Sequence, residues 1–152
     1  IPWDGTSIRY QVILATLQST YGFHIADYKL VISSCEKVLD CLRDKKGVYH
    51  AQYFSFYEYI GVAHMTLGEY TAAVENFAHA ATYARKKSCN DYLLRFYQAM
   101  NALRAGWYQE AFERYRQNQK YPNQEIRRQF AIIEAYLHFM VYVGRLRMNK
   151  PF

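Results

Sequence analysis

Histidines and the carboxylates near them are the side chains of this sequence that could carry proton transfer. An imidazole is the commonest general base near neutral pH. The histidines are spread along the chain as His24, His50, His64, His79 and His138. We single out His138 because Glu134 stands one helical turn before it, a spacing that could join an acid to a base. The same spacing stabilises a helix without any chemistry, and we therefore expect no enzyme and no catalytic residue.

The cysteines and glycines do not show the spacing that a metal or a cofactor would need. Cys35 and Cys41 lie six positions apart, which rotates them to different faces of a helix, and Cys89 is remote from both. The sequence contains no phosphate-binding glycine loop, no Gly-x-Ser-x-Gly elbow and no paired metal ligands. We therefore predict no metal site and no cofactor. Unpaired thiols, with no secretory leader in the sequence, favour a cytoplasmic protein.

A turn signal recurs between stretches that have helical periodicity. Four times a small residue is followed two positions later by a bulky apolar one: Ala26 and Tyr28, Gly68 and Tyr70, Gly106 and Tyr108, Gly144 and Leu146. The bulky members are 42, 38 and 38 positions apart. Self-similarity at a period of about 20–50 residues is typical of stacked-repeat proteins.

These turns predict helical hairpins over about 6–46, 49–87, 90–120 and 123–152, the last of them incomplete. Apolar residues within 130–142 occupy nearly all sides of the predicted helix 123–143. The apolar run is shorter than the roughly 20 residues that span a bilayer. We expect it to be buried in the protein rather than in a membrane. Because the first residue is Ile1 and the last hairpin is cut, we expect a single repeat domain over residues 1–152, taken from a longer protein.

The stretch 54–83 resembles the tetratricopeptide repeat superfamily. The resemblance rests on a small residue in the first helix, the turn, and spaced residues along the second helix: Gly61, Gly68, Tyr70, Ala73, Phe77 and Ala80. It implies an all-α fold, a right-handed α-solenoid of about three and a half antiparallel helical hairpins. The period departs from the 34 residues usual in that superfamily, and longer helices or links must absorb the difference.

The resemblance also implies that the first helix of each hairpin lines a concave groove that binds a peptide. Counting back from each turn gives these groove positions: Thr16, Thr20, His24, Glu58, Val62, Thr66, Phe96, Met100, Arg104, Glu134, His138 and Tyr142. Phe96 and Met100 would accept apolar anchors of a helix or extended peptide, and Glu58 and Glu134 would accept a basic residue.

We therefore expect a protein- or peptide-binding module, a scaffold or sensor part of a larger regulatory protein. The formal net charge of +6 keeps nucleic acid open as an alternative, because some helical-hairpin arrays bind single-stranded RNA. Glutamates and bulky apolar groups in the predicted groove disfavour a phosphate backbone. A homo-oligomer formed through the incomplete last hairpin is also left open, and no membrane contact is expected.

Overall fold

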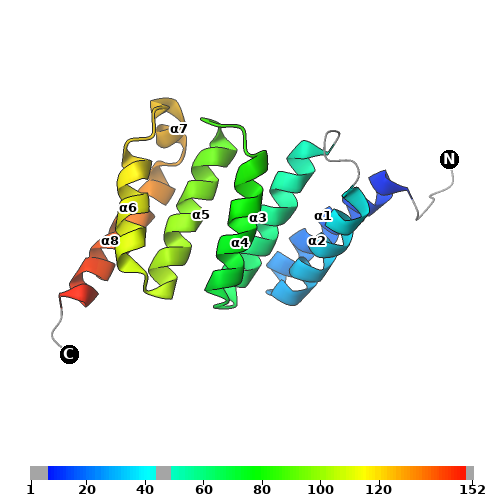
Figure 1. Cartoon of the computed structure of the whole chain (residues 1–152), viewed down its shortest axis with the longest axis horizontal. Helices are drawn as coiled ribbons and strands as arrows, with labels where there is room; N and C mark the ends of the chain where they lie inside the picture. The colour runs from blue at the N-terminus through cyan, green and yellow to red at the C-terminus, as the bar shows by residue number, and fades with distance from the viewer. Residues whose placement is uncertain (1–6, 44–48, 150–152) are drawn as a thin grey trace. The chain divides into compact units, whose positions relative to one another are not determined.

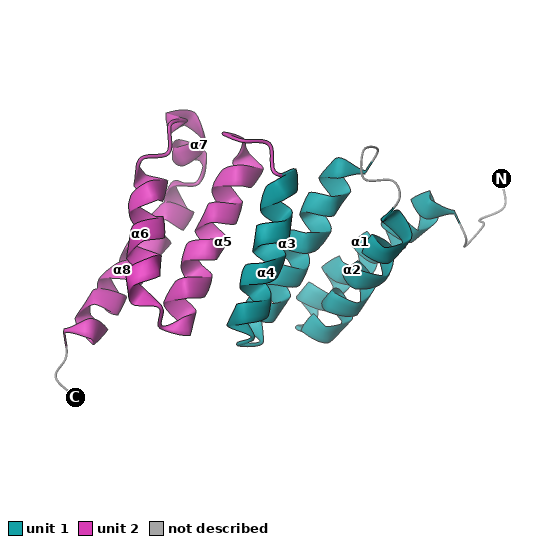
Figure 2. Ribbon diagram, in the orientation of Figure 1, with its two compact units in different colours: residues 1–83 teal, residues 84–152 magenta. Residues whose placement is uncertain are grey.

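The computed structural model describes residues 7–43 and 49–149, and over these residues the chain is all-α, as expected (Figure 1). The helices are α1 (Ile8–His24), α2 (Tyr28–Leu42), α3 (His50–Thr66), α4 (Tyr70–Tyr83), α5 (Cys89–Ala105), α6 (Tyr108–Gln119), α7 (Gln124–Gln129) and α8 (Ala131–Met148). They form two compact units, Ile1–Tyr83 and Ala84–Phe152, named unit 1 and unit 2 (Figure 2). Within the described residues no helix is both long and apolar enough to cross a bilayer.

Three of the four expected turns have the same backbone geometry. Ala26, Gly68 and Gly106 each adopt a positive φ, of 59°, 81° and 80°. In each turn the N–H of the following residue donates to a carbonyl five positions earlier: Asp27 to Gly22, Glu69 to His64 and Trp107 to Ala102, at 2.8–2.9 Å. This is the bond that closes a Schellman helix end, where a left-handed residue reverses the chain. The bends that join the two helices of each of these three hairpins are therefore equivalent.

Equivalent positions around the three turns are buried in the same way. Seven residues before the bend lies a small residue, and five and nine residues after it lie two that pack against the first helix. These sets are Ser19, Gly61 and Ala99; Val31, Ala73 and Ala111; Cys35, Phe77 and Tyr115. A spacing of four places the last two of each hairpin on one face of the second helix. The repeat predicted from the turns is thus also a repeat of burial.

Unit 1 contains two hairpins, α1 with α2 and α3 with α4, and α2 also packs against α3. Its core joins buried aliphatic residues of α2 to aromatic residues of α3 such as Tyr53 and Phe56. The Tyr53 ring stacks on Tyr83 with centroids 5.0 Å apart. In the first hairpin the Ser19 Oγ lies 3.1 Å from the Cys35 Sγ, and burial raises the pKa of that thiol to about 11.

Unit 2 contains one hairpin, α5 with α6, and α8 packs against both of its helices. The single helix expected over 123–143 is instead two helices, because the chain breaks at Phe130 between α7 and α8. Asn123 begins α7 as expected, since its side chain accepts a hydrogen bond from the Ile126 N–H at 3.2 Å.

The prediction of a turn at Gly144 is wrong. Gly144 lies inside α8 and is buried. A Cβ at this position would come within 3.1 Å of the Tyr108 ring and 3.4 Å of Leu103. The glycine is therefore needed for a close approach between helices, and it does not reverse the chain.

The close contact of Gly61 with Phe77 yields a stability prediction. A Cβ at Gly61 would lie 2.5 Å from the fully buried Phe77 ring. We expect Gly61→Ala to lower the free energy of unfolding by about 1–3 kcal/mol from overpacking, offset in part by about 1 kcal/mol of helix propensity. Urea unfolding measures the difference. In a Phe77→Leu background the same change should cost less, because the shorter side chain leaves room; an equal effect of Gly61→Ala in both backgrounds would contradict the contact.

Candidate binding surfaces

The groove positions predicted in unit 1 differ in their exposure. Thr16, Thr20, His24 and Thr66 are exposed, Val62 is half-buried and Glu58 is buried. The Thr16 hydroxyl donates to the Val12 carbonyl at 2.8 Å, which leaves its oxygen as an acceptor for a ligand. Thr16 also lines a hollow of about 150 Å³ between α1 and α3, together with Ser55 and Tyr59. Of the groove positions predicted in unit 1, Thr16 is the one that lines this hollow.

Glu58 is placed where it cannot readily bind a basic ligand. Its carboxyl is buried, and Oε2 has no hydrogen-bond partner among the described residues. Burial raises the pKa of Glu58 from 4.5 to about 7, because a carboxylate loses its hydration there. Near neutral pH the group is therefore partly protonated, and the acidic role expected for it is not available at the surface.

The groove positions predicted in unit 2 also divide. Phe96 and Met100 are buried, with exposed fractions of 9% and 2%, so a partner cannot reach them without a rearrangement. Arg104 and Tyr142 are exposed on α5 and α8. The binding role of the exposed positions stays a prediction.

Glu134 and His138, the acid and base singled out by their spacing, are each bonded to another side chain. Glu134 accepts from the Arg127 guanidinium at 2.7 Å. His138 Nδ1 forms a short hydrogen bond with the Tyr115 hydroxyl. The two bonds hold α8 against α7 and α6, which is a structural use of both residues.

A polar pocket between α2, α3 and α4 was not anticipated from the sequence. It has a volume of about 410 Å³, and its wall includes Tyr57 stacked on His79, with ring centroids 5.0 Å apart. Carboxylates of Glu36, Asp40 and Glu75 surround it, and Asp40 is paired with Arg43 at 2.9 Å. Glu75 and His79 stand four residues apart, the same signal that drew attention to Glu134 and His138. Within the described residues no group of three or more such side chains could hold a metal ion.

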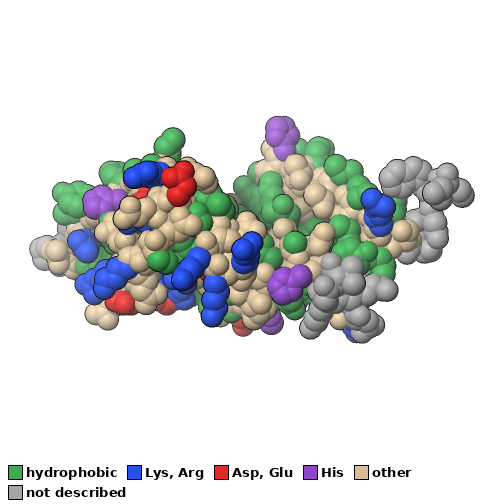
Figure 3. Space-filling model, turned by 90° about the horizontal axis from the view of Figure 1, so that it is seen from above, with side chains coloured by type: hydrophobic (Ala, Val, Ile, Leu, Met, Phe, Trp, Pro, Cys, Tyr) green, Lys and Arg blue, Asp and Glu red, His purple; other side chains and the backbone are tan. Residues whose placement is uncertain are grey.

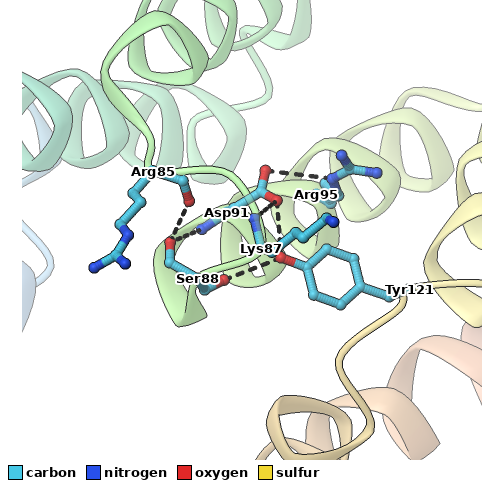
Figure 4. A network of polar contacts seen from close by, with 6 residues as sticks. All are labelled: Arg85, Lys87, Ser88, Asp91, Arg95 and Tyr121. Carbon is cyan, nitrogen blue, oxygen red and sulfur yellow. Dashed lines mark hydrogen bonds and ion pairs between the residues drawn. The ribbon is translucent and has the colours of Figure 1, made fainter.

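A polar network in unit 2 fastens the start of α5 to the loop before α7 (Figure 4). The Tyr121 hydroxyl lies 2.8 Å from Asp91 Oδ2 and 3.2 Å from the Ser88 carbonyl. Asp91 also accepts from the Lys87 N–H at 3.0 Å and from Arg95 at 3.4 Å. Burial and the bond to Asp91 raise the pKa of Tyr121, so it stays a neutral donor. Every carboxylate contact in this cluster is internal, which marks it as structural.

Five exposed large apolar side chains of unit 2 follow one side of α8. We call it the α8 apolar face; it consists of Ile132, Tyr136, Phe139, Tyr142 and Leu146. Ile132 is 87% exposed and Phe139 is 59% exposed. The opposite side of α8 is buried through Leu137, Val141 and Gly144. In unit 1, α1 exposes a shorter row of the same kind, which includes Leu17 and Tyr21.

The two units differ strongly in charge. The sequence places six Lys and Arg and eight Asp and Glu in residues 1–83, a net charge of −2. Residues 84–152 hold thirteen Lys and Arg and five Asp and Glu, a net charge of +8. Figure 3 shows most of the Lys and Arg side chains in view over unit 2. The net positive charge of the chain therefore comes from unit 2.

Comparisons with protein families, with curated proteins and with solved structures find no match for this chain. Its function is therefore inferred from its own residues.

The raised pKa of Glu58 predicts a pH dependence of stability. Between pH 4.5 and 7 the unfolded chain has released the Glu58 proton while the folded chain retains it, so stability falls as pH rises through this window. The loss is about 1.4 kcal/mol per pKa unit, or about 3 kcal/mol in all. Urea unfolding across the window should show this slope in the parent and not in Glu58→Gln. The exposed Glu75→Gln change should keep it; an unchanged slope in Glu58→Gln would refute the assignment.

The network of Figure 4 predicts a cost for removing one hydroxyl. Tyr121→Phe deletes the donor to Asp91 and should lower the free energy of unfolding by about 1–2 kcal/mol, because the acceptor is charged and mostly buried. Tyr136→Phe removes a hydroxyl from an exposed side chain and should change stability by less than about 0.5 kcal/mol. Thermal or urea unfolding of the two variants checks the difference, and equal effects would mean that the network does not stabilise unit 2.

Proposed function

We propose that this chain is a protein- or peptide-binding module of the tetratricopeptide type, serving as the scaffold or sensor part of a larger regulatory protein. Its hairpins would stack as a right-handed α-solenoid. Support comes from the three equivalent bends and from the buried positions that repeat around them. Helical hairpins stacked in this way leave their remaining faces for recognition.

The single observation that carries the proposal is the α8 apolar face. Proteins seldom expose a continuous row of large apolar side chains, and such rows mark sites of protein association. Ile132, Phe139 and Leu146 follow one side of α8 at intervals of seven residues, so they lie along one line on its surface. A helix or an extended segment with apolar anchors would cover this row and remove it from water.

Contacts of the histidines favour binding over catalysis. His50 and His79 lie against the rings of Tyr83 and Tyr57, with centroids 5.1 and 5.0 Å apart. His64 is hydrogen-bonded to Glu69 at 2.6 Å, across the turn between α3 and α4. Each of these imidazoles supports a helix contact.

Nucleic-acid binding is a second candidate, favoured by the net charge of +8 on residues 84–152. A field of that sign attracts a phosphate backbone. However, α8 has no Lys or Arg between Ala131 and Val143, so cations do not follow its exposed aromatic residues. Binding sites for single strands combine both features along one groove. Protein binding therefore accounts for more of the observed surface.

Selection from a displayed library of random peptides tests the proposed function. We expect the full chain to enrich peptides with apolar residues at helical spacing. Phe139→Ser should weaken their binding about tenfold or more, because a large side chain at the centre of an interface carries much of the affinity. Val74→Ser, which removes an exposed apolar side chain from α4, is the matched control. Failure to enrich such peptides, or equal binding by the two variants, would reject the proposal.

A further inference from the structure

After Glu134, the side chains of α8 are basic or neutral. From Ala135 to Asn149 the sequence contains no Asp or Glu, and its charged residues are Arg145 and Arg147. Both arginines are exposed in the last turn of α8. The Arg145 guanidinium lies 5.3 Å from the centre of the Phe112 ring, and neither arginine forms an ion pair among the described residues. The C-terminal end of the face thus offers cations without a carboxylate in the same helix turn, whereas the carboxylate of α8, Glu134, lies near its other end.

The face also carries hydrogen-bond donors that suit an anion. Tyr136 and Tyr142 are 46% and 58% exposed, and each presents a phenolic hydroxyl beside the apolar row. A hydroxyl and a guanidinium both donate to a carboxylate, and a guanidinium does so with two N–H groups at once. Near the start of α8 the exposed Arg128 lies 3.9 Å from Glu125 in solvent, where such pairs contribute little, and it lines a shallow hollow together with Glu134. Cations therefore stand near both ends of the row.

Resting on the proposed function, we infer that the α8 apolar face binds an acidic amphipathic helix of another protein. Its apolar side would cover Ile132, Phe139 and Leu146. Its flanking Asp or Glu side chains would meet Arg145 and Arg147 at one end and Arg128 at the other. The row from Ile132 to Leu146 is about 21 Å long at 1.5 Å per residue, which corresponds to about four turns of a partner helix.

Charge complementarity selects this occupant over the alternatives. A second copy of the chain would bring two units of net charge +8 together, and each α8 would meet the same arginines. A nucleic-acid strand would cross the middle of α8, where the exposed side chains are Ile132, Tyr136 and Phe139, without cations to bind its phosphates. An acidic helix alone matches both the apolar centre and the basic ends.

Two designed peptides test the inference on the full chain by fluorescence anisotropy. Both are about 18 residues long, roughly five helical turns, and share Leu at positions i, i+3, i+4 and i+7. One carries Glu at its flanking positions and the other carries Lys. We expect the Glu peptide to bind at least about tenfold more tightly, because the surface charges are basic. Added salt should reduce this preference.

Variants of the chain locate the interaction. The Arg145→Glu and Arg147→Glu double variant should lose the preference for the Glu peptide. The Lys86→Glu and Lys120→Glu double variant changes the net charge equally, at residues outside α7 and α8, and should retain the preference. Phe139→Ser should weaken both peptides. Circular dichroism and thermal unfolding confirm that the variants stay folded.

Each other outcome separates the inference from the proposed function. Equal or tighter binding of the Lys peptide, still lost in Phe139→Ser, would overturn the acidic partner and leave a protein-binding face. Binding of neither peptide would overturn the inference, while the displayed library tests peptide binding independently. Loss of affinity in Phe139→Ser for a 20-nucleotide poly(U) strand or for phosphatidylserine vesicles, with no binding of the Glu peptide, would assign the face to nucleic acid or lipid. If the chain forms a dimer at micromolar concentration and Phe139→Ser dissociates it, the face would be assigned to a second copy of the chain.

Discussion

The left-handed bend between paired helices is the constraint on which the other features depend. At Ala26, Gly68 and Gly106 the backbone must take a positive φ so that the next N–H can reach a carbonyl five residues back. That bond fixes where the second helix begins and therefore which of its residues meet the first helix. Because of this register, Ala73 and Phe77, five and nine residues after Gly68, pack against α3. Gly61 must be small because the Phe77 ring lies directly opposite it.

The same register decides what remains outside. In α8 the side that includes Leu137 and Val141 is buried by α5 and α6, and the opposite side is left to solvent although its residues are just as apolar. The expectation that the apolar run is buried in the protein is therefore met on one side of α8 only. Ile132 and Phe139 are exposed because α5 and α6 cover only the other side of α8. The apolar side chains left on the exposed side favour association with another molecule.

Periodicity and turn chemistry were sufficient to predict the first six helices and three of the bends, but not the break at Phe130 between α7 and α8. Gly68 and Gly106 carry a direct signal, since glycine adopts a positive φ without steric cost. Gly144 is also a glycine, but its role is different: it lets the Tyr108 ring pack closely against α8. Sequence alone does not separate these uses, because both need a residue without a side chain. Gly68 and Gly106 have a positive φ and open space where a Cβ would lie, whereas Gly144 is helical and packs against Tyr108.

The binding surfaces were less predictable than the helices. Counting back from the turns placed Phe96 and Met100 in a groove, yet both are buried, because the count fixes a helix face and does not state what covers it. The pocket beside His79 needs three helices, α2, α3 and α4, to converge, and the spacing of Glu75 and His79 is its only local sign. The basic character of unit 2 could have been found by counting charges within each compact unit.

The thiol enclosed in the first hairpin has a consequence for how that hairpin can be observed. Cys35 is fully buried beside Ser19 and remains protonated, whereas Cys41 and Cys89 are exposed. Thiolates are the reactive form of cysteine, so alkylating reagents should modify the exposed pair in the native protein and spare Cys35. The rate of labelling at Cys35 therefore reports how often α1 and α2 separate, and it provides a probe of local opening of the first hairpin.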